Sequence, residues 1–143
     1  MLIKQISVFV ENKSGRLAEI TKVIADANID MRALSIADTT DFGILRVIVN
    51  KPDEAEKLLR EAGMTVSVTN VIAIGVNDEP GCFSNALQVL AANNVDVEYM
   101  YAFVSRDTKK AYIIVRVADN DKAIGVLTRE GIELLDEKGF YEI

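Results

Sequence analysis

The sequence predicts an α+β fold in which one strand–helix–strand–strand–helix–strand unit occurs twice. The first observation is that residues 12–30, "NKSGRLAEITKVIADANID", place a charged loop and one glycine before a helical pattern that ends in Asn-Ile-Asp. The same plan returns at residues 78–96, "DEPGCFSNALQVLAANNVD". The shift between the two stretches is 66 residues, almost half of the chain.

The second observation is that the similarity extends beyond these stretches. Between residues 6–37 and 72–103, seven of 32 positions are identical. From Gly43 onward the shift becomes 68, and six of 24 positions agree, including Gly63 with Gly131. The change in shift places a two-residue insertion in the turn around "SRDTKK", where a repeated fold tolerates it best. We therefore predict two domains, residues 1–70 and residues 71–143.

The elements of the first copy follow from its periodicity. "QISVFV" alternates apolar and polar residues with the two-residue period of a half-buried strand. Leu17, Ile20, Val23, Ile24 and Ala27 are then spaced for one apolar helical stripe. "IDMRALSIAD" and "GILRVIVN" predict two strands joined by the turn "DTTD". "PDEAEKLLREAG" has the proline, early acids and final glycine of a helix, and "MTVSV" closes the unit.

The second copy repeats this order. "VIAIGV" predicts the first strand, and Phe83, Ala86, Leu87 and Leu90 form the helical stripe. "VDVEYMYAFVS" and "KAYIIVRV" predict the middle strands, followed by the helix "NDKAIGVLTREG" and the closing strand "IELL". Six elements in this order predict a four-stranded antiparallel sheet with two helices on one face, the arrangement of ferredoxin-like folds.

Strand alternation predicts which side chains of the second copy meet its helices. Met100, Ala102 and Val104 are expected to face inward, while three aromatic residues line the opposite face. Those aromatic residues are Tyr99, Tyr101 and Phe103. We favour their contact with the other copy or with another subunit, since a solvated sheet face seldom carries three aromatics. The alternative is that the domain's own tail, "GFYEI", covers them.

Composition excludes several functional classes. The chain has no histidine and one cysteine, so the commonest general base is absent and no internal disulfide can form. The net charge of -6 argues against a nucleic-acid partner, because affinity for phosphates depends on clustered Lys and Arg. The apolar runs are strand-sized and the N-terminus soon becomes polar, so we expect no membrane span, no secretory signal and a cytoplasmic location.

The glycine loop before each first helix suggests an anion site. Glycine tolerates unusual dihedrals and leaves room for an anion to approach backbone N–H groups at a helix start. We expect Asp30 to lie within reach of the Asn12 loop, and Asp96 within reach of the Asp78 loop. Such a cradle suits a zwitterion, with the carboxylate on the loop and the ammonium on the aspartate. The alternative is purely geometric, because strand-to-helix turns need glycine and aspartate is common after helices.

These residues resemble the ACT domain, a small amino-acid-sensing module of enzymes of amino-acid metabolism. Its usual loop has Asn, two positions, often Pro, then Gly and an apolar residue. The first copy shows Asn12, Ser14, Gly15 and Leu17, and the second shows Asp78, Pro80, Gly81 and Phe83. The resemblance covers the whole chain and implies two tandem ferredoxin-like ACT-type domains. It departs from the family in Ser14, in Asp78, and in the two acids after the helices, Asp30 and Asp96.

The resemblance and the loop pattern together define the candidate ligand-binding residues. In the first copy they are Asn12, Lys13, Ser14, Gly15, Arg16, Leu17, Asn28, Ile29 and Asp30. In the second copy they are Asp78, Glu79, Pro80, Gly81, Cys82, Phe83, Asn94, Val95 and Asp96. We favour the Asn12 loop as the carboxylate cradle, because Asp78 and Glu79 would repel a carboxylate.

Other chemistries of this general topology find little support. Cys82 begins a helix, where its thiol could be activated, but no His or second Cys accompanies it. Arg16 could bind phosphate as in small acylphosphatases, yet their characteristic loop is not recognisable. A metal chaperone would need Cys-x-x-Cys, and an RNA-binding protein would need basic residues beside the aromatic face. We therefore expect no catalysis, no metal and no cofactor.

The sequence thus predicts a non-catalytic amino-acid sensor whose two ACT modules associate side by side through their sheets or helices. We expect a free amino acid as ligand, bound at an interface between modules, because a few charged hydrogen bonds alone leave a weak site. Expected partners are an enzyme of amino-acid metabolism and further copies of the chain, as a homodimer or larger oligomer. The alternatives are a regulatory small subunit similar in role to that of acetolactate synthase, and a purely structural oligomerisation module.

Overall fold

A computed structural model describes residues 1–38, 41–105 and 109–143 of the chain. These residues form two compact units, one made of residues 4–69 and the other of residues 70–143 together with residues 1–3. The predicted ACT-type domain limits of 1–70 and 71–143 stay a prediction. The turn "DTTD" and the insertion around "SRDTKK" extend outside the described residues.

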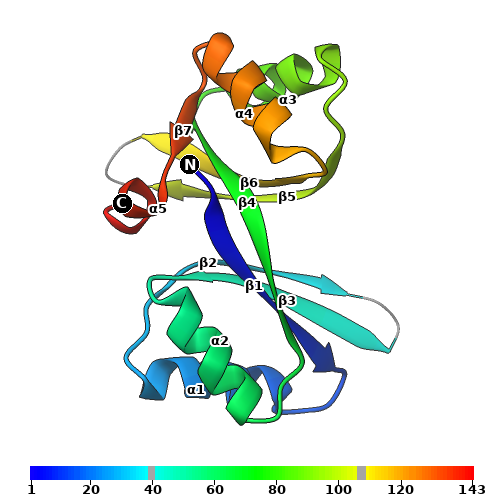
Figure 1. The fold of residues 1–143 in the computed structure, drawn as a ribbon, viewed down its shortest axis with the longest axis vertical. Helices are drawn as coiled ribbons and strands as arrows, with labels where there is room; N and C mark the ends of the chain where they lie inside the picture. The colour runs from blue at the N-terminus through cyan, green and yellow to red at the C-terminus, as the bar shows by residue number, and fades with distance from the viewer. Residues whose placement is uncertain (39–40, 106–108) are drawn as a thin grey trace. The chain divides into compact units, whose positions relative to one another are not determined.

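The unit of residues 4–69 has the predicted element order. Its elements are β1 (Ile3–Glu11), α1 (Arg16–Asp26), β2 (Met31–Asp38), β3 (Phe42–Val49), α2 (Pro52–Glu61) and the start of β4 (Val66–Asn77). The boundary between the units falls within β4. The strand order is β2-β3-β1-β4, and β3 runs antiparallel to both β1 and β2. Helices α1 and α2 lie together on one face of this sheet (Figure 1).

The unit of residues 70–143 repeats the plan. After β4 come α3 (Cys82–Ala92), β5 (Val97–Ser105), β6 (Lys110–Val117), α4 (Asn120–Arg129), β7 (Glu133–Leu135) and α5 (Glu137–Tyr141). The order is β7-β4-β6-β5, with every described pair antiparallel. Helices α3 and α4, coloured green and orange, cover one face of this sheet (Figure 1). The predicted ferredoxin-like fold is confirmed, while α5 was not predicted.

Each unit has its own core between sheet and helices. In the first, Ile6, Val8 and Val10 of β1 pack with Ile20 and Ile24 of α1. Apolar residues two apart on a strand meet apolar residues four apart on a helix, which is what the two periodicities predict. The second core is built in the same way from residues of β4, β6, α3 and α4; it includes Ile72, Ile74, Leu90, Ile113, Val115 and Leu127.

The predicted inward side chains of β5 are on the expected face but are not buried. Met100 pairs with Val115 and Ala102 with Ile113, and both partners belong to the core under the helices. Met100 is nevertheless 41% exposed, and Ala102 is exposed as well. Because β5 is the outermost strand, the helices do not cover it. The inward burial predicted for Met100 and Ala102 was therefore wrong, and Val104 lies outside the described side chains.

One of the aromatic residues on the other face of β5, Phe103, contacts rings of its own unit. The ring of Phe103 lies 5.6 Å from that of Tyr112 and 5.6 Å from that of Phe140, measured between centroids. Phe140 belongs to α5 and is 1% exposed. At Phe103 the contact is thus with the domain's own tail, the alternative that the sequence left open.

Candidate functional site

The loop between β1 and α1 ends in a glycine that its backbone conformation requires. Gly15 has φ 87°, and it is the N-cap of α1 without any side-chain hydrogen bond to the first helical turn. A Cβ atom added to Gly15 would meet no atom within 4 Å, so the dihedral and not lack of space selects glycine. The Arg16 N–H donates to the Lys13 carbonyl over 3.3 Å, and without a capping side chain the next N–H groups of the first turn keep their capacity to bind an acceptor.

The loop between β4 and α3 has the same geometry. Gly81 has φ 91° and caps α3 without a side-chain hydrogen bond. The N–H of Asn85 donates to the Gly81 carbonyl over 2.9 Å, as the N–H of Glu19 donates to the Gly15 carbonyl over 3.0 Å. The structure therefore places two equivalent uncapped helix starts where the sequence predicted glycine loops.

The asparagines after α1 and α3 terminate those helices. Asn28 and Asn94 have φ 55° and 58°, in the left-handed region that asparagine tolerates better than most residues. The N–H of Ile29 donates to the Ile24 carbonyl, and that of Val95 to the Leu90 carbonyl, closing the last turn. Ile29 and Val95 are 5% and 7% exposed, so both are core residues that accompany the cap.

The expectation that Asp30 lies within reach of the Asn12 loop is wrong. Helix α1 has 11 residues and spans about 16 Å, which separates the loop before it from the residues after it. The sheet register agrees, because Glu11 lies opposite Phe42 at one end of β3 whereas Met31 lies opposite Val49 at the other. The expectation fails because α1 returns the chain alongside β1, so that the residues after the helix lie at the opposite end of the sheet from the loop before it.

Asp30 has its own local partners at that far end. Its N–H donates to the Asn50 side-chain oxygen over 3.0 Å, and its carboxylate accepts from Arg32 at 3.1 Å. Asp96 is placed equivalently, in a small hollow of about 150 Å³ lined by Asn94, Val95, Asp96, Ala118, Asp119 and Lys122. Gly81 is not among these residues, so the expected reach of Asp96 to the Asp78 loop is wrong for the same reason.

A larger hollow lies beside the glycine loop of residues 70–143. Its volume is about 470 Å³. Its lining residues come from three parts of the chain, which are β4, the start of α3 with the residues just before it, and the turn that leads into β7 with the first residue of that strand. The lining residues are Gly75, Val76, Asn77, Pro80, Gly81, Cys82, Asn85, Gly131, Ile132 and Glu133. Pro80, Gly81 and Cys82 are residues that the sequence predicted for the site.

Charge at this hollow is concentrated in one ion pair. Glu133 accepts a hydrogen bond from Lys110, which raises the pKa of Lys110. Glu133 also covers Gly75, since a Cβ atom at Gly75 would lie 3.0 Å from a Glu133 carboxylate oxygen. The small residue on β4 therefore makes room for the acid on the neighbouring β7.

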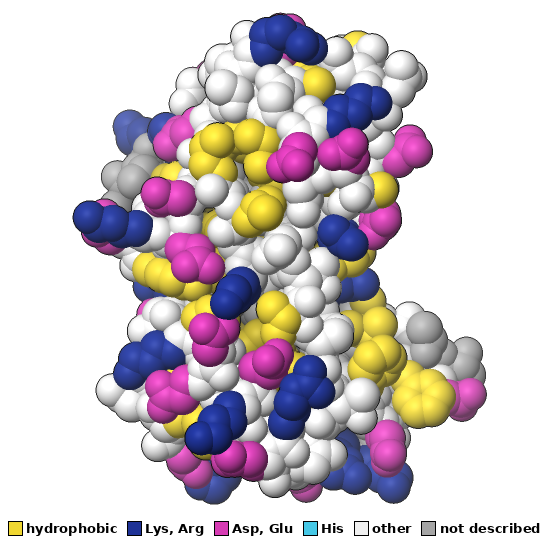
Figure 2. Space-filling view, viewed as in Figure 1, with side chains coloured by type: hydrophobic (Ala, Val, Ile, Leu, Met, Phe, Trp, Pro, Cys, Tyr) yellow, Lys and Arg dark blue, Asp and Glu magenta, His cyan; other side chains and the backbone are white. Residues whose placement is uncertain are grey.

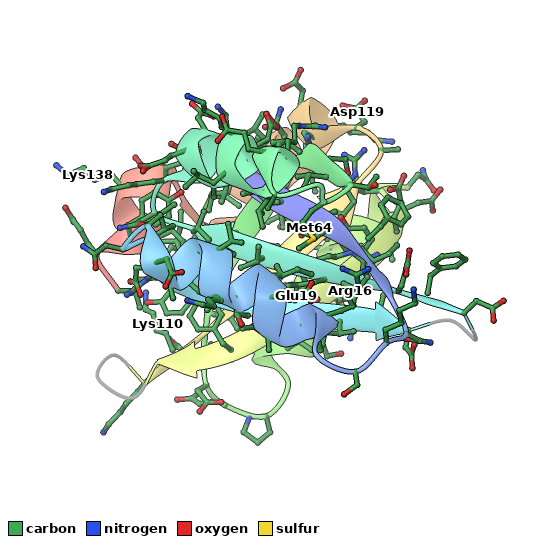
Figure 3. All side chains as sticks on the ribbon, turned by 90° about the horizontal axis from the view of Figure 1, so that it is seen from below. Arg16, Glu19, Met64, Lys110, Asp119 and Lys138 are labelled. Atoms are coloured by element: carbon green, nitrogen blue, oxygen red, sulfur yellow. The ribbon has the colours of Figure 1, made fainter. Side chains whose placement is uncertain are left out.

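A hollow at the equivalent place in residues 4–69 is smaller, about 100 Å³. It is lined by Phe9, Val10, Glu11, Arg16, Ile20, Gly63, Met64 and Thr65. Arg16 stands where the second copy has Cys82, and its guanidinium pairs with Glu19 at 3.0 Å and with Glu11 at 3.7 Å. Figure 3 shows Arg16 and Glu19 at the start of α1.

The charges of the first loop lie on three neighbouring side chains. Lys13 pairs with Glu11 at 3.0 Å. This hydrogen bond from Lys13, with the positive charges of Lys13 and Arg16, lowers the pKa of Glu11. Glu11 is therefore an anion at neutral pH, beside two cations.

An apolar hollow of about 310 Å³ adjoins this charged one. Its lining includes Phe9, Glu11, Phe42 and Thr65, and three of these four also line the smaller hollow. Phe9 is 50% exposed and Phe42 is 54% exposed. Figure 2 shows hydrophobic side chains at the surface among the charged ones.

The remaining predicted residues of the loops and first helical turns are not among the lining residues of the two loop hollows. Asn12, Lys13, Ser14, Asp78 and Glu79 are all exposed. Leu17 and Phe83, at equivalent positions in the first turns of α1 and α3, are 40% and 38% exposed.

Sequence reasoning missed the residues contributed by the turn that leads into the last strand of each unit and, in the second copy, by the first residue of that strand. These are Gly63, Met64 and Thr65 in the first copy and Gly131, Ile132 and Glu133 in the second. The signal was available in the predicted topology, because in this fold the closing strand pairs beside the first.

Two further absences hold for residues 1–38, 41–105 and 109–143. No cluster of three His, Cys, Asp or Glu residues there is arranged to hold a metal ion. No helix in that part of the chain has the length and apolarity needed to cross a membrane.

Two ferredoxin-like units, each with a glycine loop leading into its first helix, define a class of tandem α+β domains. The ACT domain pair family matches residues 1–143, and the chain belongs to this family. Among curated proteins, no sequence matches the chain. The predicted tandem ACT architecture is confirmed.

Solved structures agree with this assignment. Protein BT0572 from Bacteroides thetaiotaomicron is 42% identical with a TM-score of 0.94, over 100% of this chain and 98% of that one. The ligand-free regulatory subunit of aspartate kinase from Thermus thermophilus is 15% identical with a TM-score of 0.63, over 90% and 93% of the two chains. The regulatory subunit of aspartate kinase from Thermus flavus is 11% identical with a TM-score of 0.62, over 88% of this chain and 90% of that one. At these last two identities the likeness shows the fold alone.

Proposed function

We propose that this ACT domain pair is a non-catalytic regulatory protein that binds a free amino acid at the hollows beside its glycine loops. The observation that carries the proposal is the recurrence of one geometry. Each unit has a hollow between an uncapped helix start and the turn before its last strand. Uncapped N–H groups favour a carboxylate, and the helix dipole adds to that preference.

A regulatory role accords with what surrounds the hollows. The chain has no histidine to act as a general base, and the carboxylates that line the two hollows, Glu11 and Glu133, are each paired with a lysine. Regulatory subunits of aspartate kinase share the fold, which supports an enzyme of amino-acid metabolism as the partner. Binding regulates such a partner only if the amino acid prefers one of two conformations or assemblies.

Thermal unfolding of the full chain with each of the twenty amino acids at millimolar concentration tests the proposal. A ligand that binds only the folded protein raises Tm, by an amount that corresponds to about 2.7 kcal/mol at 100 times Kd. We expect one amino acid, or one chemical group of them, to raise Tm. No shift with any of the twenty, together with stable assembly of the chain, would favour a structural oligomerisation module instead.

Variants at the two separated places sharpen this test. Asn12→Ala changes the glycine loop, and Asp30→Ala changes the far end of α1. If the ligand is held by one unit, Asn12→Ala weakens binding and Asp30→Ala does not, because α1 separates them. If both variants weaken binding, a second module completes the site, as expected for a ligand at an interface between ACT modules. Asp26→Asn, on the exposed surface of α1, is the matched control.

A further inference from the structure

The two hollows of residues 4–69 together offer what an amino acid with an apolar side chain requires. They share Phe9, Glu11 and Thr65, so the charged hollow and the apolar one adjoin at these residues. The hydrogen bond from the Phe9 N–H to the Thr65 carbonyl, 3.0 Å, holds the strands that carry this shared wall. Glu11 lines both hollows and lies 3.7 Å from Arg16, so it is the side chain that connects the charged part to the apolar part.

The charged part presents one cation and one anion side by side. The Arg16 guanidinium lies 3.7 Å from the Glu11 carboxylate, which is an anion at neutral pH like other exposed glutamates. Both side chains are partly exposed, 37% for Arg16 and 53% for Glu11. Exposed ion pairs contribute little to stability, so a ligand with both charges can exchange with this pair at small cost.

The apolar part is large enough for a side chain. Its volume of about 310 Å³ falls at the lower end of the range for small-molecule sites, and Phe9 and Phe42 supply apolar surface. Each phenyl group is about half exposed, so a ligand side chain laid between them removes apolar surface from water.

The second copy lacks this combination at every equivalent position. The register that sets Glu11 opposite Phe42 sets Asn77 opposite Lys110. With the shift of 66 residues, Gly75 replaces Phe9 and Cys82 replaces Arg16. The second hollow thus has the Lys110–Glu133 pair in place of Arg16 and Glu11, and none of its described lining residues is aromatic.

We propose that residues 4–69 select a free L-amino acid with a large apolar side chain, of the size of leucine or phenylalanine. The Arg16 guanidinium binds the carboxylate, the Glu11 carboxylate binds the ammonium, and the side chain lies between Phe9 and Phe42. This inference rests on the proposed function, since it names the ligand class of one of the two proposed sites.

Calorimetric titration of the full chain with L-leucine and L-phenylalanine, against L-serine and L-aspartate, is the first test. We expect the apolar pair to bind at least tenfold more tightly. Phe9→Ala and Phe42→Ala should each weaken L-leucine binding about tenfold, because half-burial of such a ring corresponds to about that factor. Phe42→Lys, which introduces the residue type of the second copy, should remove the preference for apolar ligands. Leu34→Ala is the matched control, since Leu34 is 54% exposed in the same unit but lines neither hollow.

Truncated ligands test the roles of the two charges. 4-Methylpentanoate is leucine without its ammonium, and 3-methylbutylamine is leucine without its carboxylate. Glu11→Gln should weaken L-leucine about tenfold and leave 4-methylpentanoate unchanged, because the lost contact is a charge-assisted hydrogen bond to the ammonium. Arg16→Gln should weaken L-leucine and leave 3-methylbutylamine unchanged. Asp26→Asn is the charge control.

The outcomes separate this inference from the proposed function. Tighter binding of L-serine or L-aspartate than of the apolar pair overturns the apolar selectivity, while amino-acid binding stands. Unchanged L-leucine binding by both Phe9→Ala and Phe42→Ala has the same consequence. If Cys82→Arg weakens L-leucine binding and Arg16→Gln does not, the site lies in the second copy. That result also overturns the apolar selectivity proposed for residues 4–69. Absence of binding by any of the twenty amino acids overturns both.

Discussion

The two copies of the loop hollow share a backbone and differ in their chemistry. Gly15 and Gly81 have φ values within 4° of each other, 87° and 91°, and each begins an 11-residue helix. The hollow beside Gly15 nevertheless measures about 100 Å³ and that beside Gly81 about 470 Å³.

The difference follows from a few side chains. Arg16 lines the first hollow and pairs with two acids, whereas the shorter Cys82 stands at this position in the second. On the adjacent surface, the second copy has Gly75 and Lys110 at the positions of Phe9 and Phe42. It has Glu133 at the position of Thr65. A duplicated fold thus preserved the backbone conformation at the helix start, while substitutions on the surrounding strands gave one copy an aromatic pair, Phe9 and Phe42, and the other Gly75 and Lys110 at the equivalent positions.

The largest effects should come from the cores, where the two copies are most alike. Leu59 and Leu127 occupy equivalent positions in α2 and α4 and are 0% and 1% exposed. Leu59→Ala and Leu127→Ala should each lower the free energy of unfolding by about 2–5 kcal/mol, because each removes buried methyl groups and leaves a cavity. Urea denaturation followed by circular dichroism measures this. Leu34→Ala, at an exposed position, should change stability by less than about 0.5 kcal/mol. A loss below 1 kcal/mol at only one of the two leucines would show that the cores are not equivalent.

The glycine loops should respond alike but more weakly. Gly15→Ala and Gly81→Ala should each lower the free energy of unfolding by about 1–2 kcal/mol, because a side chain is strained at positive φ even where space is free. Gly125→Ala is the matched control, inside α4 with nothing within 4 Å of the added Cβ. There alanine should stabilise the protein by about 0.5–1 kcal/mol, since glycine is unfavourable in a helix. Equal destabilisation at all three glycines would contradict the role given to the dihedral.

The smallest effect concerns protonation of the Glu11 carboxylate. The equivalent residue of the second copy is Asn77, which does not titrate. The pKa of Glu11 is lowered, chiefly by the hydrogen bond from Lys13. A lowered pKa gives a contribution to stability that is present above the usual carboxyl pKa and is lost as the pH falls through the lowered value. Carbon-13 NMR titration of the Glu11 carboxyl should give a midpoint below the usual value near 4.3. Lys13→Met should raise that midpoint, and an unchanged midpoint would exclude Lys13 as the main cause.

Most of the fold could be predicted from the sequence because it depends on local periodicity and on the repeat. The two-residue period of Ile6, Val8 and Val10 and the helical spacing of Ile20 and Ile24 were enough to identify β1 and α1 and their common core. The repeat also fixed the element order, because the same order of strand and helix patterns occurs in both copies. The burial of Met100 and Ala102 could not be predicted, because an apolar residue on the correct face is covered only if its strand is central.

The candidate site was predicted in part. The glycine loops are where the sequence placed them, whereas Asp30 and Asp96 are not beside them. Distance along the chain does not give distance in the folded protein. Gly15 and Asp30 are fifteen positions apart, and the 11-residue helix between them places them at opposite ends of that helix. The walls contributed by Phe42, Thr65 and Glu133 were missed because strand pairing brings them from distant parts of the sequence.

The sequence by itself determined the duplication, the order of the elements, the two left-handed glycines and the stripes of apolar residues that form each core. These properties depend on residues that are neighbours along one strand or helix, so periodicity and residue type suffice. Only the tertiary structure decided which side chains meet at each hollow, that Arg16 lines one and Cys82 the other, and that the acids after the helices lie elsewhere. The physical reason is that pairing between strands, and not distance along the chain, determines which charges and apolar surfaces share a site.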